Sequence, residues 1–173
     1  KKYGGKIQPI KVFNPNHELY KLLDEIRIAL PGRKTADKFL KVVSQCIENP
    51  TLDLIAEGMK VFSSKSDINK DLLLENAVML ADWNLIWWNA TEQIVSLHPI
   101  IKNYFGSLLS EHELKQIHKE LANSYSSKLV YEKANSLEDV KPKILAIKHA
   151  GNAEDYDFVE ELLFYPMIQQ HSL

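Results

Sequence analysis

The sequence predicts a mostly α fold in which several helices are combined with one β-hairpin. Apolar residues recur at intervals of three and four through most of the 173 residues, which is the period of an amphipathic helix. The interval 85–97 is instead made of short aromatic and β-branched runs around a polar centre, which is typical of paired strands. Six glycines and seven prolines are few for a turn-rich all-β chain.

Residues 1–50 are predicted to form a helical segment. The stretch 1–15 lacks a regular pattern and contains two glycines and two prolines, so we expect it to be irregular. Helical spacing of apolar residues then begins near Asn16, a suitable N-cap, and ends at a Pro-Gly pair. A second helical stripe runs from 36 to 47.

Residues 51–107 have the pattern of a winged-helix domain. A helix is expected over 51–63, followed by a helical stretch over 67–82 that is either one helix or two helices broken near 74–76. The hairpin at 85–97 would then form the wing. Helices followed directly by a two-stranded wing are the element order of this fold.

Residues 108–173 are predicted to be the start of a TPR-like region of antiparallel helices. A helical pattern over 99–108 closes the winged-helix domain, and further helical patterns cover 110–125, 137–150 and 154–165. Ser110 and Glu113 have the spacing of a capping box, and Pro166 is expected to close the last helix. Successive short antiparallel helices are typical of a helical repeat array.

Composition excludes several broad classes of protein. The formal charge of -2 gives no chain-wide attraction to nucleic acid or an anionic membrane. No apolar run is long enough for a membrane span, and the N-terminal residues have no signal-peptide core. A single cysteine excludes an internal disulfide framework and indicates a reducing compartment. We therefore expect a cytoplasmic protein without a nucleic-acid or membrane partner.

A DNA-binding winged helix is the sharpest alternative, and the charges oppose it. Residues 65–99 contain Lys65 and Lys70 but five acidic residues, a net charge of -3. The expected recognition helix would therefore repel phosphate. The tryptophans at its end and in the hairpin are better explained as packing groups or as a protein interaction surface, and these are Trp83, Trp87 and Trp88.

No catalytic or metal-binding residues are predicted. His112 and His118 are six residues apart, whereas a zinc-binding helix needs histidines four apart. We expect His118 to be packed in the core. Cys46 lies in an apolar stripe without a nearby histidine and is expected to be an inert buried thiol.

Three motifs in order resemble a known family. Residues 97–105 read LHPIIKNYF, similar to the LHPLI-x-x-YF element that closes the winged-helix domain of STAND-class signal-transduction NTPases with NACHT or NB-ARC modules. Residues 118–125 resemble the H-x-x-L-A-x-x-Y start of the attached TPR-like helices. Residues 149–163 resemble a later helical hairpin of the same arrays, with Val159 in place of the usual alanine.

The resemblance implies a regulatory fragment that is not itself an enzyme. The family's histidine at the position of His98 contacts the β-phosphate of bound ADP, so ADP or ATP would be a ligand of a longer parent protein. The fragment itself would hold no cofactor, because its sequence contains no phosphate-binding loop. Its partners would be an upstream nucleotide-binding domain and an unknown protein ligand. The alternative is a stand-alone helical protein–protein interaction module.

Overall fold

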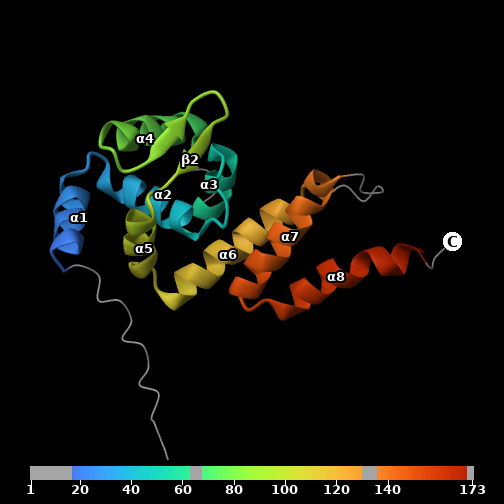
Figure 1. The fold of residues 1–173 in the computed structure, drawn as a ribbon. Helices are drawn as coiled ribbons and strands as arrows, with labels where there is room; N and C mark the ends of the chain where they lie inside the picture. The colour runs from blue at the N-terminus through green and yellow to red at the C-terminus, as the bar shows by residue number, and fades with distance from the viewer. Residues whose placement is uncertain (1–16, 63–67, 130–135, 171–173) are drawn as a thin grey trace, which may run out of the picture.

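The computed structural model describes residues 17–62, 68–129 and 136–170 (Figure 1). The helices and strands are, in order, α1 (His17–Ala29), α2 (Arg33–Gln45), α3 (Leu52–Met59), α4 (Lys70–Asp82), β1 (Trp87–Asn89), β2 (Ile94–Ser96), α5 (Pro99–Ser107), α6 (Glu111–Ser126), α7 (Leu137–Asn152) and α8 (Tyr156–Gln170). The predicted fold class is confirmed, since the described residues are mostly helical with one antiparallel hairpin.

Helix α2 lies at the centre of the core. Its inner face buries Phe39, Leu40 and Val43 almost completely, and it packs against α3, α4 and α5. These apolar residues recur at helical spacing, so one stripe of α2 can contact several neighbours at once. Burying a side chain of this size contributes about 1.5–3 kcal/mol relative to leaving it in water.

One isolated β-bridge joins the hairpin to the segment that precedes α3. Thr51, just before α3, forms an isolated antiparallel bridge with Ile94 of β2. The Leu52 amide donates to the Gln93 carbonyl (3.2 Å), and the Val95 amide donates to the Pro50 carbonyl (2.9 Å). This order of elements agrees with the winged helix expected from the sequence, which stays a prediction.

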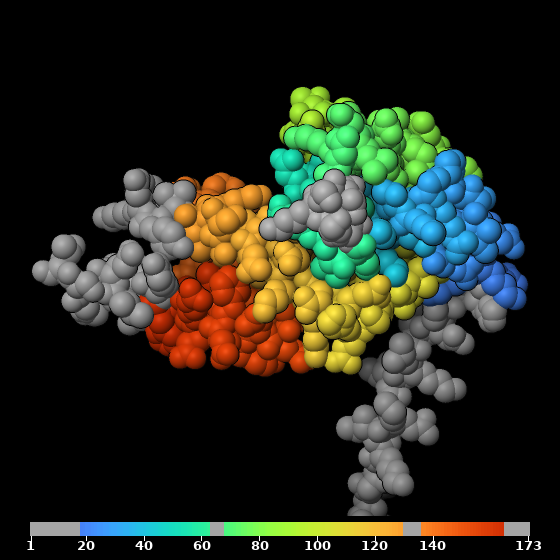
Figure 2. Space-filling view, turned by 180° about the vertical axis from the view of Figure 1, so that it is seen from behind, coloured from blue at the N-terminus to red at the C-terminus, as the bar shows by residue number. Residues whose placement is uncertain are grey.

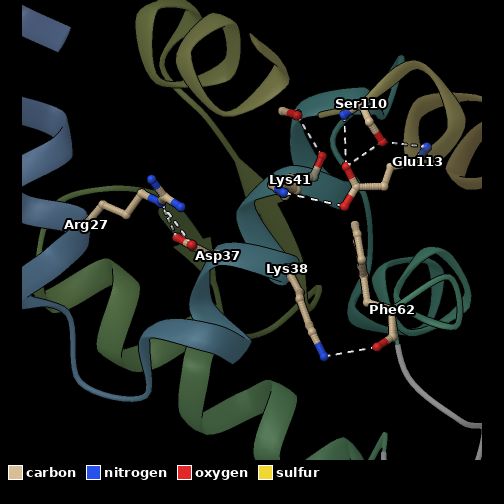
Figure 3. A network of polar contacts seen from close by, with 8 residues as sticks. Arg27, Asp37, Lys38, Lys41, Phe62, Ser110 and Glu113 are labelled. Carbon is tan, nitrogen blue, oxygen red and sulfur yellow. Dashed lines mark hydrogen bonds and ion pairs between the residues drawn. The ribbon is translucent and has the colours of Figure 1, made fainter. Parts of the chain in front are cut away.

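Polar contacts fasten α1 and α6 to this core (Figure 3). Arg27 of α1 makes two hydrogen bonds to the carboxylate of Asp37 on α2, at 2.8 and 2.9 Å. Lys41 of α2 pairs with Glu113 at the start of α6, with 3.7 Å between charged atoms. Glu113 also closes the predicted capping box with Ser110, so one side chain both begins α6 and attaches it to α2.

Helices α6, α7 and α8 form an antiparallel extension beyond the core (Figures 1 and 2). α6 packs against α3 and α7, and α7 in turn packs against α8. Ile117 and Leu121 of α6 and Ala146 and Ala150 of α7 are fully buried. The small residues on α7 let the two helix axes approach closely.

The sequence left one local alternative open, and one local prediction is wrong. Residues 70–82 form one helix, the first of the two alternatives, and the buried Asn76 donates its side-chain amide to the Leu72 carbonyl (2.7 Å) within this helix. α8 continues past Pro166 to Gln170. A proline removes one backbone hydrogen bond without always ending a helix, and Pro142 lies inside α7 in the same way. The predicted cap at Asn16 and the irregular stretch 1–15 lie outside the described residues.

Candidate functional site

His98 lies where the hairpin ends and α5 begins. Its backbone is extended (φ -62°, ψ 139°), Pro99 occupies the first helical turn, and the His98 carbonyl accepts the first helical hydrogen bond from Lys102 (2.9 Å). The imidazole is exposed, and its Nδ1 accepts a hydrogen bond from the Ile100 amide at 3.3 Å. His98 is therefore the N-cap of α5.

The capping hydrogen bond determines which ring nitrogen carries the proton of the neutral imidazole. A neutral imidazole has one donor nitrogen and one acceptor nitrogen, and here Nδ1 is the acceptor. Nε2 therefore holds the proton and can donate it to another group. Capping the helix and donating to an anion are compatible roles for this side chain, because each uses a different ring nitrogen.

Trp87 lies beside His98 on the hairpin. Its ring is 6.2 Å from the imidazole, centroid to centroid, with the planes tilted by 55°. Trp87 pairs across the hairpin with Ser96, two residues before His98, and 61% of it is exposed. An aromatic side chain so exposed, next to a ring nitrogen that bonds to none of the other described residues, suits contact with another molecule.

Trp87 and Trp88 line a groove along the hairpin. The groove has a volume of about 760 Å³, and Ile47, Glu48 and Glu92 also contribute to it. Trp88 is half-buried against the core, opposite the fully buried Val95. Trp88 therefore stabilises the hairpin as well as lining its groove.

Trp83 lies in a different groove, on the outer face of α4. This groove, of about 440 Å³, is lined by Leu74, Glu75, Val78, Met79, Asp82 and Trp83. It shares no lining residue with the hairpin groove. The three tryptophans that the sequence grouped as one interaction surface thus line two grooves, and their use as an interface stays a prediction.

One buried polar cluster was not predicted from the sequence, and it is a histidine pair between α6 and α7. His118 Nδ1 and His149 Nδ1 are 2.8 Å apart, so one imidazole donates to the other. Tyr125 stacks on His149, with ring centroids 5.7 Å apart and the planes 12° from parallel. His149 is completely buried, and its Nε2 has no hydrogen-bond partner among the described residues. His118 was expected in the core, but the residues alone do not indicate its partner.

Burial keeps this pair uncharged. Loss of water around the rings lowers the pKa of His118 to about 4 and that of His149 to about 3. The neighbouring His118 and the charge of Lys102 on α5 contribute smaller parts of the lowered pKa of His149. No group of three His, Cys, Asp or Glu side chains in the described part of the chain could hold a metal ion.

Cys46 is buried at the end of α2, as the sequence predicts. Burial raises the pKa of its thiol to about 12, although the nearby Lys102 acts in the opposite direction. Lys102 Nζ donates to the Cys46 carbonyl at 2.6 Å. We therefore expect the thiol to stay protonated and unreactive in the native protein.

Comparison with known proteins gave no match among protein-family models, curated proteins or solved structures. The resemblance of the three motifs to STAND-class NTPases therefore stays a prediction. Within residues 17–62, 68–129 and 136–170, no helix is both long enough and apolar enough to cross a bilayer.

Proposed function

We propose that this chain is a non-catalytic regulatory element of a STAND-type signal-transduction NTPase. In this role the winged helix docks on a nucleotide-binding domain and the helices from α6 onward begin a sensor array. ADP or ATP would belong to that domain of the parent protein. The proposal rests on the family motifs of the sequence and on one observation in the structure.

That observation is the Nε2–H of an exposed His98 at the start of α5, which donates to none of the other described residues. Its Nδ1 is occupied by the Ile100 amide, so the ring is held in one orientation. The helix start adds partial positive charge at the same place, which favours an anion such as a phosphate. A nucleotide phosphate presented by a docked domain would therefore meet both a hydrogen-bond donor and a favourable dipole.

The test uses two variants of His98 in the complete gene product. His98→Ala removes both the cap and the outward donor, whereas His98→Ser keeps a good N-cap and removes only the imidazole. Loss of a hydrogen bond to a charged phosphate costs about 1.5–3 kcal/mol, or about 10- to 150-fold in ADP affinity. We expect both variants to lose ADP affinity, and only His98→Ala to lose about 1 kcal/mol of stability.

A different outcome would reject the nucleotide role. If ADP affinity is unchanged in both variants, while His98→Ala alone lowers the melting temperature, His98 is only a helix cap. A complete gene product without a phosphate-binding loop would reject the role as well. The isolated 173-residue chain, as a further control, should bind ADP only at about millimolar concentration or more weakly, because its sequence contains no such loop.

The second candidate function is a stand-alone protein–protein interaction module. The outer groove of α4 supports it, because exposed apolar side chains there are combined with acidic ones. The same charges argue against a DNA-binding role, since α4 contains one lysine against three acidic residues.

A further inference from the structure

The outer face of α4 is built from two neighbouring rows of side chains. Residues four apart lie above one another on a helix, so Leu74, Val78 and Asp82 form one row. Glu75, Met79 and Trp83 form the second row, and the shallow groove lies over both. Val78 and Met79 thus lie in the middle of the groove, Leu74 and Trp83 lie at two diagonal corners, and the two carboxylates lie at the other two.

The apolar part of this face is accessible. Leu74 is 40% exposed, Val78 45% and Trp83 40%, whereas Leu73, Ala77 and Leu80 on the inner face are buried. Green α4 lies at the upper edge of the molecule in both Figure 1 and Figure 2. Apolar side chains grouped in a groove on a helix face are typical of a binding surface.

The two carboxylates of the groove have no cation partner among the described residues. Neither Glu75 nor Asp82 forms an ion pair with another of the described residues, although Lys70 on the same helix pairs with Asp53 at 3.2 Å. Glu75 and Asp82 are seven residues apart, or about 10 Å along the helix axis. Their charges therefore stand at the two ends of the apolar patch.

We propose that this groove binds a basic amphipathic helix of a partner protein. A helix with apolar residues at i, i+3 or i+4, and i+7 would cover the patch formed by Leu74, Val78 and Trp83. Lysine or arginine residues about two turns apart on that helix would reach Glu75 and Asp82. The apolar contacts supply affinity, and the two charges select a basic helix over an acidic one.

The charges disfavour the other occupants. In a symmetric contact between two copies, the same patch would face itself, and Glu75 and Asp82 would meet like charges. A nucleic acid would bring phosphates to the same two carboxylates. This inference does not depend on the proposed role of His98, because the α4 groove and the α5 N-terminus share no residue.

Two fluorescent 18-residue peptides provide the test. Both carry the same leucine stripe, and one has lysine where the other has glutamate at the flanking positions. We expect the full chain to bind the lysine peptide at least about tenfold more tightly than the glutamate peptide, by fluorescence anisotropy at about 50 mM salt, with a smaller ratio at higher salt. A double variant, Glu75→Lys with Asp82→Lys, should reverse this preference.

Matched leucine variants place the contact on α4. Leu74→Ser should weaken binding of the lysine peptide about tenfold or more, whereas Leu22→Ser, at a similarly exposed leucine on α1, should not change it. Equal affinity for the two peptides, or a preference that survives the double charge reversal, would overturn the inference. So would self-association of the chain that Leu74→Ser abolishes.

Failure here and failure of the proposed function give different results. ADP retention by the complete gene product should be unchanged by Leu74→Ser, and peptide binding should be unchanged by His98→Ser. Each pair of measurements therefore tests one surface alone.

Discussion

The buried pair of His118 and His149 should make this protein lose stability at mildly acidic pH. The pKa of both imidazoles lies well below the ordinary value near 6.5, at about 4 and about 3. The unfolded chain therefore binds more protons than the folded chain at any pH between these values and 6.5. Stability is complete above about pH 6.5 and falls as the pH drops toward the folded pKa values.

The size of the effect follows from this difference in proton binding. Each of these histidines stays neutral in the folded state but titrates near pH 6.5 in the unfolded state. For each one, the free energy of unfolding falls by about 1.4 kcal/mol per pH unit below 6.5. Between about pH 7.5 and pH 5, this amounts to roughly 2 kcal/mol for each of the two residues and roughly 4 kcal/mol for the pair. A loss of this size is a large part of the stability of a typical domain.

Urea unfolding at several pH values measures the loss. Linear extrapolation gives the free energy of unfolding for the wild type and for a double variant, His118→Leu with His149→Phe, which keeps apolar volume and removes both titrating groups. We expect the double variant to lose roughly 4 kcal/mol less than the wild type over this range. His112→Gln, which removes an exposed imidazole from the same helix, should keep the wild-type dependence.

A direct NMR titration of the wild-type protein tests the same prediction if the double variant does not fold. In the wild-type protein, the NMR resonances of the His118 and His149 rings should stay constant between about pH 7.5 and 5 while the chain remains folded. Titration of either ring near pH 6.5 in the folded protein would refute the reasoning. Equal pH dependence of wild type and double variant would refute it as well.

Two further predictions concern tight packing around α2. A Cβ at Gly58 would lie 2.5 Å from Val42 Cγ1 on α2. Gly58→Ala should therefore lower the free energy of unfolding, measured in urea, by about 1–3 kcal/mol. A variant as stable as the wild type would contradict this packing. The Cys46 thiol should react with a thiol reagent only after unfolding, because it is buried and its pKa is raised to about 12, and rapid stoichiometric reaction of the native protein would contradict its burial.

Much of the fold was predictable because each element carries its own local signal. The period of apolar residues located the helices, and the change of period after Trp83 located the hairpin. The capping box at Ser110 was likewise readable from two residues three apart. Where the sequence was ambiguous, as at Asn76, a side-chain hydrogen bond within the helix decided the outcome.

Contacts between distant segments were not predictable in this way. His118 and His149 are 31 residues apart, and nothing local to either residue indicates that their rings meet. The central position of α2 in the core was not predictable either, because it depends on contacts with distant segments. In the sequence, the apolar stripe of α2 is like that of any amphipathic helix. The position of His98 was readable from the order of strand, histidine and proline, but the orientation of its ring depends on the hydrogen bond from Ile100.

Helix α5 connects His98 to α2 and α6. In the proposed function, a signal from the nucleotide would pass along this helix. It begins at His98, and one turn later Lys102 holds the end of α2 through the Cys46 carbonyl and lowers the pKa of His149. The chain then passes directly into α6, whose first turn is tied to α2 by Glu113. A nucleotide contact at His98 that displaced α5 would therefore strain its bond to α2 and the polar contact that fixes α6. In the proposed role, the nucleotide state would reach α6 and α7 through α5, which Lys102 bonds to the end of α2 and which continues into α6.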